Sequence, residues 1–384
     1  MSDPFNDAKA WDVFCDAMKA AGRQLLGPDY PSDSRDRAEG FLHLAKLFEM
    51  SLAWQLDGAD PDFPRLVTLN DTFELADNRF AAVRGDASYT LTANVSTLFD
   101  INLSLHDGWP WLGQRQVWGD IGLSDLEVSE NGDLTVVLSP DEQPGNWLPL
   151  PAEARVLQIR EYYEDWSLHS PGVFEITRLG SEGQAPPRMT SDALAMRLAA
   201  GAQWAAEYTP AHMTSLIANL RALPANTVMP PGGQGGGNRN IAYGFGRFEL
   251  AEDQSMILEF EAPHARLWGV HWLTLPWYEN PDMVNRSTSV NSHDAFVNDD
   301  GRVRLVVGAS DSGAPNWLDT NGFDEGVLVA RFVWGDGEPI ELTTSVQRTS
   351  DVMAHLPVDT PAATAAQRQE SQRIRRTHLA RRRR

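Results

Sequence analysis

Two blocks of the chain decide the fold: NGDLTVVLSPDEQPGNWLPLPAEARVLQIR at residues 131–160 and DGRVRLVVGASDSGAPNWLDTNGFDEGVLVAR at residues 300–331. Each block opens with a tight-turn pair, Asn-Gly or Asp-Gly, and an apolar run typical of a β-strand follows it. A polar loop, the triplet Asn-Trp-Leu and a second apolar run ending in Arg160 or Arg331 come next, at nearly equal spacing. This agreement in order, spacing and residue type predicts an internal duplication of one β-unit.

The sequence outside the blocks indicates helices before and between the β-units. Apolar residues recur at helical spacing over 7–26, over 34–56 and again over 190–222, and Trp11 and Trp54 are expected to be core anchors. We therefore predict a mainly β chain with helical additions, an α+β fold. It consists of two related antiparallel β-sandwich or jelly-roll-like units, N-terminal helices and a helical insert between the units.

The predicted boundaries follow these changes of pattern. They give an N-terminal helical segment at 1–65, a first β-sandwich unit at 66–185, a helical connector at 186–229, a Gly-rich linker at 230–240, a second β-sandwich unit at 241–350 and an Arg-rich tail at 351–384. The Gly-rich linker is expected to be a flexible connector, with an anion cradle as the alternative. The tail is expected to be solvated and folded over the acidic body, with a tether for nucleic acid or membrane as the alternative.

Charge and cysteine content exclude several classes of function. The chain has 32 Lys and Arg against 53 Asp and Glu, a net charge of −21, so its body should repel nucleic acid and anionic membranes. The single cysteine, Cys15, excludes an intramolecular disulfide and a multi-cysteine metal site. Neither a signal peptide nor a long apolar span is recognisable. We expect a cytoplasmic protein, and self-association into a homo-oligomer remains open.

The residues that most cofactors need are missing from the pattern. Lysine occurs only at Lys9, Lys19 and Lys46, so the rest of the chain can form neither a Schiff base nor a phosphate-binding P-loop. The nine histidines show no compact metal-binding spacing, and no dinucleotide-binding glycine motif follows a strand. We therefore expect no metal and no cofactor, and a small molecule as the partner.

Candidate chemistry gathers where the two copies end. Arg160 and Arg331 follow apolar strands, and each could clamp a substrate anion or form a structural ion pair, which the repetition favours. Glu161 shares a face with apolar neighbours, where burial would raise its pKa and suit it to proton transfer. The alternative for Glu161 is an acidic edge strand shielded against aggregation. In the second copy, His271 reads most commonly as a hydrogen-bonded core imidazole.

The sequence also resembles a known family. The stretch at residues 290–334, VNSHDAFVNDDGRVRLVVGASDSGAPNWLDTNGFDEGVLVARFVW, and the stretch at residues 145–166, GNWLPLPAEARVLQIREYYEDW, are similar to the bacterial domain of unknown function 1214 family. The resemblance implies an all-β, jelly-roll-like body. It implies little chemistry, because the family is named for its lack of an assigned activity.

These observations predict a cofactor-independent enzyme of lyase type that acts on a small hydrophobic or aromatic hydroxylated molecule. Elimination or retro-aldol cleavage needs only proton transfers and a cationic clamp, and 13 Trp and 7 Tyr offer an aromatic lining. The expected proton carriers are Glu161, Tyr163, His271, Tyr278 and His293. The expected substrate-binding residues are Arg160, Arg331, Trp272, Trp277 and Asn291.

A second hypothesis is a carbohydrate-active hydrolase or a non-catalytic ligand-binding β-sandwich protein. In that case Trp109, Trp111, Trp272 and Trp277 would stack on sugars or other flat ligands. The framework prediction is separate from both hypotheses: Trp147 and Trp317 should each be buried at the base of their loop.

Overall fold

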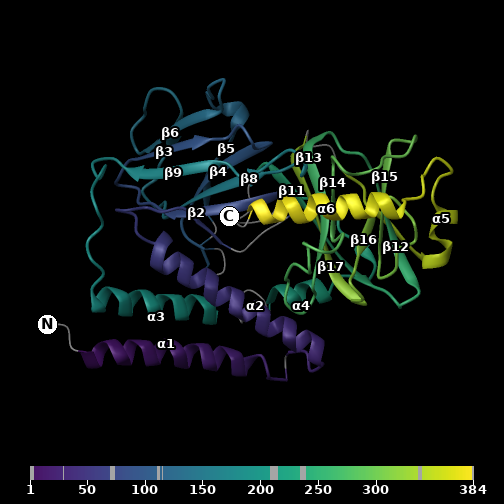
Figure 1. Cartoon of the computed structure of the whole chain (residues 1–384), viewed down its shortest axis with the longest axis horizontal. Helices are drawn as coiled ribbons and strands as arrows, with labels where there is room; N and C mark the ends of the chain where they lie inside the picture. Colours follow the sequence, from purple (N-terminus) through teal and green to yellow (C-terminus); the bar gives the residue numbers. More distant parts are fainter. Residues whose placement is uncertain are drawn as a thin grey trace.

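The computed structural model describes residues 4–28, 30–69, 74–109, 113–114, 116–207, 215–233, 239–335 and 340–382. Over these residues the chain forms two β-units, with helices at the N-terminus, between the units and at the C-terminus (Figure 1). The expected mainly β fold with helical additions is confirmed. Trp111 and residues 234–238 of the Gly-rich linker lie outside the described residues.

The first unit contains two sheets that share one apolar core. Sheet A has the strand order β1-β2-β8-β4-β5, and sheet B the order β7-β6-β3-β9. Their strands are β1 Val67–Thr68, β2 Ala76–Ala82, β3 Tyr89–Asn94, β4 Asp100–His106, β5 Val117–Gly122, β6 Asp133–Ser139, β7 Trp147–Pro149, β8 Val156–Tyr162 and β9 Val173–Arg178. Side chains alternate across each strand, so that Leu157 and Ile159 face the core while Gln158 and Arg160 point to the other face of sheet A.

The second unit repeats this topology strand for strand. Sheet C has the order β10-β11-β17-β13-β14, and sheet D the order β16-β15-β12-β18, which is the order of the first unit carried nine strands onward. Its strands are β10 Thr227–Val228, β11 Ile241–Glu249, β12 Gln254–Glu261, β13 Ala265–Leu273, β14 Ser289–Asn291, β15 Arg302–Gly308, β16 Trp317–Asp319, β17 Glu325–Gly335 and β18 Thr343–Arg348. The predicted duplication is therefore confirmed by topology.

The Asn-Trp-Leu triplets hold the same place in both units. In each unit the asparagine amide donates to two backbone carbonyls, from Asn146 to Glu127 and Thr135 and from Asn316 to Phe296 and Arg304. The tryptophan that follows donates its indole N–H to a backbone carbonyl of the preceding strand at 3.0 Å in both units. A short parallel strand pair results, β6 with β7 and β15 with β16.

The expected burial of both tryptophans is wrong. Trp147 and Trp317 are only half-buried, whereas the leucines that follow them, Leu148 and Leu318, are fully buried. The physical reason is the two-residue alternation of a strand, which turns one member of the Trp-Leu pair inward and the other outward. The leucine is thus the core anchor of the triplet, and the tryptophan closes the loop with its N–H.

Helices cover the outer faces of sheets A and C. They are α1 Pro4–Gln24, α2 Ser34–Ala53, α3 Ser191–Glu207 and α4 Ser215–Arg221, and a π-helical turn, Trp54–Gly58, extends α2. Helices α1, α2 and α3 pack together, and Trp277 from the second unit docks into their apolar core. Trp54 is buried as expected, but Trp11 is 56% exposed, so its assignment as a core anchor is wrong.

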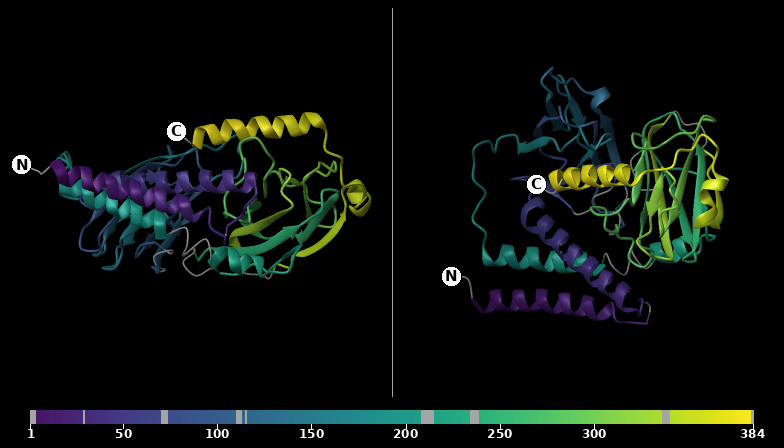
Figure 2. Two further views of the ribbon diagram at one scale, coloured as in Figure 1. Left: turned by 90° about the horizontal axis from the view of Figure 1, so that it is seen from below. Right: turned by 45° about the vertical axis from the view of Figure 1, so that its right-hand side comes forward.

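The Arg-rich tail is an ordered helix. After the short helix α5, Val352–His355, the chain forms α6, Ala365–Arg382, which runs along the second unit and reaches the first with its C-terminal end (Figures 1 and 2). The tail lies over the body as expected. It is not solvated throughout, because Arg375, His378, Leu379 and Arg382 are buried.

The triplet account predicts a stability cost for its leucine. Leu318→Ala should lower the free energy of unfolding by about 2–5 kcal/mol, the usual loss for truncating a buried leucine. Val358→Ala is the control, since Val358 is fully exposed and its truncation should stay within about 0.5 kcal/mol. Urea denaturation followed by fluorescence measures both values, and equal stability of the two variants would contradict the assignment.

Candidate functional site

The two units meet where the outer faces of sheets A and C touch. Leu75, Ala76 and Tyr162 of the first unit share one buried apolar cluster with Ile241, Leu267 and Val333 of the second. Trp334 packs against the ring of Tyr162, with ring centroids 5.0 Å apart. This junction cluster fixes how polar residues on the two faces are placed relative to each other.

A buried acid and a buried imidazole from different units meet beside this cluster. Glu74 lies just before β2, and its Oε2 is 2.6 Å from Nδ1 of His271 on β13. Both side chains are almost fully enclosed, with 1% and 2% of their surface exposed. Arg331 on β17 contributes a third group, because its Nη1 lies 3.5 Å from the same carboxylate oxygen. We name these residues the Glu74–His271–Arg331 cluster.

The charges of this cluster follow from burial and from Arg331. Burial alone pushes the pKa of Glu74 upward, but His271 and Arg331 outweigh it, so the carboxyl pKa is held below its usual value. Burial lowers the pKa of His271, and the nearby carboxylate only partly opposes this. Arg331 therefore compensates an ionised Glu74, while the imidazole is neutral at pH 7. With its Nδ1–H toward the carboxylate, the imidazole carries its basic lone pair on Nε2.

One oxygen of Glu74 lacks a protein donor. Oε1 is buried and accepts no hydrogen bond from the residues that the structure describes. A buried carboxylate oxygen without a donor is costly, and the adjacent positive charge of Arg331 offsets part of this cost. A side chain on Gly269 would stand 2.8 Å from Leu75 and 3.2 Å from this oxygen. The glycine thus allows the strand that carries Glu74 to approach sheet C.

A second polar group lies on the outer face of sheet A. We name Asn78, Ser104, His106, Gln158 and Arg160 the polar layer. Nε2 of His106 lies 2.9 Å from the amide oxygen of Gln158, whose amide nitrogen donates to Asn78 at 2.9 Å. Arg160 donates from Nε to the same Asn78 oxygen at 3.1 Å. The chain of donors assigns the Nε2–H tautomer to His106.

The electrostatics of the polar layer differ from those of an exposed surface. Burial lowers the pKa of His106 to about 4, although its hydrogen bond to Gln158 opposes the shift. Burial also raises the pKa of Tyr162 to about 12, and Arg160 acts against this rise. At pH 7 the imidazole of His106 in the layer and the adjacent phenol of Tyr162 are therefore both neutral, and Arg160 is the cation of the layer.

Aromatic rings border the polar layer. Phe80 is the cross-strand partner of Gln158, and its ring lies 5.2 Å from that of Trp109. Trp109 in turn stacks on Trp204 of α3 at 5.3 Å and meets Trp54 edge-on at 4.9 Å. Polar and aromatic groups thus lie side by side on the outer face of sheet A, the combination that small-molecule sites use.

The expected candidates Glu161 and Tyr163 lie together, but away from His271. Glu161 is buried, as expected, and burial raises its pKa even though Arg79 binds one oxygen and the Gly172 amide the other. Its strand β8 lies in the middle of sheet A, so the alternative of an acidic edge strand is wrong. The Tyr163 hydroxyl lies 3.5 Å from Asp77, and burial strongly raises its pKa.

Two expected ligand-stacking tryptophans are framework residues. Trp272 is fully buried in the core of the second unit, and its N–H donates to the carbonyl of Asp319 at 2.9 Å. Trp277 is buried among the helices, and its N–H donates to the carbonyl of Asp36 at 2.8 Å. Neither ring offers a face to a ligand, so their assignment as substrate-binding residues is wrong. The carbohydrate hypothesis loses its main support with them.

The remaining candidates lie apart from the cluster. The Asn291 amide donates to the carbonyl of Glu164 at 2.9 Å and so ties the units together. His293 is 44% exposed and lies 3.6 Å from Asp165, at the surface. Tyr278 lies in the loop after β13 with a positive φ of 52° and packs near α4. Of the expected residues, the Glu74–His271–Arg331 cluster thus contains only His271 and Arg331, with Arg160 on the facing unit.

Glu74 and His106 are the two important residues that sequence reasoning missed. Glu74 belongs to no repeated motif, and it reaches His271 only because the units dock. His106 likewise belongs to no repeated motif. One signal was available for it: Ser104, His106 and Gln158 sit at alternate positions on two strands, which places them on one face.

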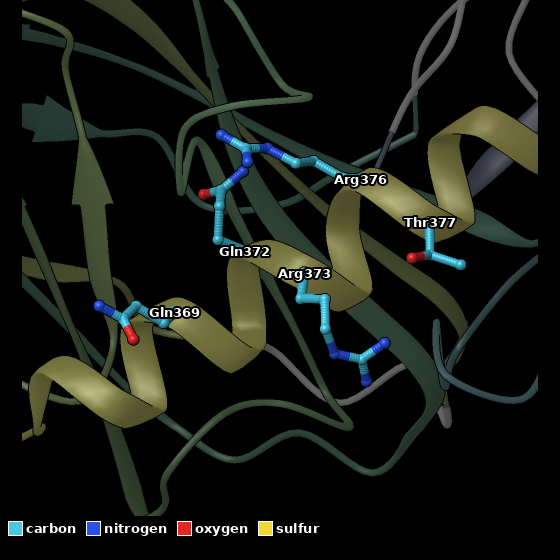
Figure 3. Close-up of a pocket in the computed structure, with 5 residues that line it drawn as sticks. All are labelled: Gln369, Gln372, Arg373, Arg376 and Thr377. Atoms are coloured by element: carbon cyan, nitrogen blue, oxygen red, sulfur yellow. The ribbon is translucent and has the colours of Figure 1, made fainter.

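An open groove of about 420 Å³ lies on the exposed side of α6 and is separate from these residues. Its lining consists of Gln369, Gln372, Arg373, Arg376 and Thr377, and Figure 3 shows Gln372 and Arg376 turned toward one another while Arg373 points elsewhere. Among the described residues, no group of three or more His, Cys, Asp and Glu side chains could hold a metal ion. Within the same part of the chain, no helix is long and apolar enough to cross a membrane.

Comparison with known proteins gives a family and a relative of known structure. Residues 112–164, a range that includes β5 to β8, match a family described as a protein of unknown function, DUF1214. This part of the chain is similar to the DUF1214 family. It contains the first Asn-Trp-Leu triplet and Arg160, so the resemblance seen in the sequence is confirmed there. No curated protein matches the chain.

The fold recurs in a solved structure. A crystal structure of an uncharacterised protein from Burkholderia cenocepacia is similar, with 26% identity and a TM-score of 0.80, and covers 90% of this chain and 98% of that one. A protein from Vibrio parahaemolyticus is more distant, with 11% identity and a TM-score of 0.44 over 79% of this chain and 98% of that one. The stretch that is similar to DUF1214 thus lies within a larger fold that the protein from Burkholderia cenocepacia shares.

The buried His106 predicts a pH-dependent stability. Its folded pKa of about 4 lies below the value of about 6.5 expected in the unfolded chain, so only the unfolded state takes up this proton as pH falls from 6.5 to 4. Between about pH 7 and pH 5 the imidazole should therefore lower the free energy of unfolding by about 2 kcal/mol.

The measurement compares urea unfolding of the parent chain and His106→Gln at both pH values. Gln keeps a donor toward Gln158 but cannot titrate, so the stability gap between the two proteins should narrow by about 2 kcal/mol at the lower pH. His264→Gln, at an exposed histidine, is the control and should follow the parent. A gap that is the same at both pH values would contradict the buried neutral imidazole.

Proposed function

We propose that this protein is a cofactor-independent enzyme that uses acid–base catalysis of the lyase type. Its substrate would be a small aromatic or hydrophobic hydroxylated molecule that carries an anionic group, and its compartment the cytoplasm, whose reducing conditions suit a chain with one cysteine. The observation that carries the proposal is the Glu74–His271–Arg331 cluster, a buried carboxylate, imidazole and guanidinium assembled from two units.

The arrangement of the cluster supports proton transfer. A carboxylate that holds Nδ1 of an imidazole leaves Nε2 as the basic atom, which is the arrangement of a general base. The cluster is nearly closed to water, so a neutral imidazole is the form present at pH 7. Arg331 adds a fixed positive charge that would bind the carboxylate of the substrate and stabilise the enolate charge that develops in the reaction.

The proposed reaction is an elimination. Nε2 of His271 removes a proton from the carbon next to the substrate carboxylate, and the C–H electrons form the new double bond. The hydroxyl on the neighbouring carbon leaves as water after it receives a proton from an acid. Tyr243, the cross-strand neighbour of Arg331, is the proposed acid because its phenol O–H lies on the same face of sheet C as this cluster. Return of the proton from His271 to the phenolate completes the cycle.

The surroundings support the choice of substrate. Arg160 on sheet A and Arg331 on sheet C occupy equivalent strand positions and both border the junction that contains Tyr162 and Tyr243. Two guanidinium groups favour an anionic substrate. The aromatic rings of Phe80, Trp109 and Trp204 beside the polar layer favour a flat, apolar body.

The test uses β-hydroxy-β-phenylpropionate as the first probe, together with related aromatic β-hydroxy acids. Their dehydration produces a conjugated alkene that absorbs in the near ultraviolet. His271→Gln and Glu74→Gln should each lower the rate about 100-fold or more, the usual contribution of a positioned acid or base. His264→Gln should keep the parent rate, because His264 is exposed and outside the cluster.

Two results would contradict the proposal. One is the absence of turnover by the parent protein across the whole panel. The other is turnover that His271→Gln and Glu74→Gln retain at the parent rate, which would place the chemistry elsewhere.

A further inference from the structure

We propose that helix α6 is the positioning element of the Glu74–His271 pair and acts through the buried side chains of Arg382 and Arg375. The catalytic meaning of this inference rests on the proposed function, whereas the positioning itself can be measured without a substrate. Glu74 and His271 belong to different units, so something must fix the units to within a fraction of an ångström for the pair to form.

Arg382 holds β2, the strand that directly follows Glu74. Its guanidinium makes a bidentate ion pair with Asp77 on β2, at 2.8 and 2.7 Å, and donates to the Ala76 carbonyl at 2.8 Å. It also lies 3.5 Å from the carbonyl of Glu74 itself. The ring of Tyr163 lies under the guanidinium at 4.7 Å. Only 1% of the Arg382 side chain is exposed, so its ion pair with Asp77 is buried. A buried bidentate pair fixes the two side chains more rigidly than a surface ion pair does.

Arg375 holds the strand next to His271. It donates to the backbone carbonyl of Ser289 at 3.0 Å and to the Ser289 hydroxyl at 3.1 Å. Ser289 on β14 is the cross-strand partner of His271 on β13. The indole of Trp166, from the first unit, lies under the Arg375 guanidinium at 4.8 Å. Arg375 therefore contacts the second unit directly beside the imidazole.

The contacts of Arg375 and Arg382 are fixed relative to one another, because both side chains belong to the same helix. Arg375 and Arg382 are seven residues apart, about two turns and about 10 Å along a helix, so both project from one face of α6. His378 lies between them on this face and stacks on Trp166 at 4.8 Å. Both guanidinium groups also interact electrostatically with the Glu74 carboxylate. The helix thus sets the spacing of the two strands and adds positive charge around the acid.

A third arginine of the same helix supplies a matched control. Arg368 also makes a bidentate ion pair, with Asp311 at 3.0 and 2.9 Å, and its guanidinium lies over the ring of Trp317 at 5.4 Å. Both partners belong to the second unit and lie far along α6 from Arg382. Loss of this contact should weaken the docking of α6 without a direct effect on the strand that carries Glu74.

The experiment follows the imidazole of His271 by NMR in full-length protein labelled with ¹⁵N-histidine, with His271→Gln to assign its signals. Glu74 and Arg331 are the charged groups that face this imidazole among the described residues. In Arg382→Gln the midpoint of its titration should move upward toward about 6.5, because the loosened contact lets water reach the buried imidazole. The Nδ1–H tautomer should also lose its dominance. In Arg368→Gln both readouts should stay at parent values.

Two outcomes would overturn the inference. An unchanged His271 titration in Arg382→Gln would mean that α6 does not position the Glu74–His271 pair. Equal shifts in Arg382→Gln and Arg368→Gln would mean that α6 affects the pair only through its general packing on the two units. If Arg382→Gln does not fold, Arg382→Gln combined with Asp77→Asn removes both buried charges and is judged by the same readouts. Should the titration move as described while His271→Gln keeps full activity, the proposed function fails and the positioning stands.

Discussion

The contact between Glu74 and His271 is the constraint on which the account of this protein depends. Neither residue has its partner within its own unit, and each is almost fully enclosed. A buried charge is costly unless it is paired. The docking of the two units brings Arg331 to the Glu74 carboxylate and so supplies this pairing. The junction cluster brings the two units into contact, and α6 is bound to both of them, so the two side chains can meet.

The duplication explains why the two outer faces differ in chemistry. In strand position, His271 of the second unit corresponds to Ser104 of the first, and Tyr243 corresponds to Asn78. Arg160 and Arg331 are the shared element, but Arg160 binds an amide where Arg331 binds a carboxylate. The two cores are both apolar because packing constrains both copies, whereas the outer faces carry different polar side chains.

The fold could be predicted from patterns among residues that are close in sequence. The turn pairs, the Asn-Trp-Leu triplets and the apolar runs depend on neighbours in sequence. The two apolar runs predicted in each repeated block agree with β6 and β8 in the first unit and with β15 and β17 in the second. The half-burial of Trp147 and Trp317 was not predictable from size alone, because the direction of a strand side chain depends on register.

Most of the site depended on contacts between distant segments. The pairing of Glu74 with His271 and the docking of α6 through Arg382 each join residues that are far apart in the chain. An arginine-rich tail in an acidic protein resembles a solvated segment in composition, and only its partners show which arginines are buried. Of the expected residues, His271 and Arg331 were therefore accessible to sequence reasoning, whereas Glu74 was not.

A double-mutant cycle in the free energy of unfolding tests the central contact most directly. The cycle uses Glu74→Gln, His271→Gln and the double variant, measured by urea denaturation at about pH 7. Because the two side chains form one buried pair across the junction, the account predicts a coupling free energy of about 1–3 kcal/mol. Additive losses, with a coupling below about 0.5 kcal/mol, would show that the two residues do not interact and would contradict the account.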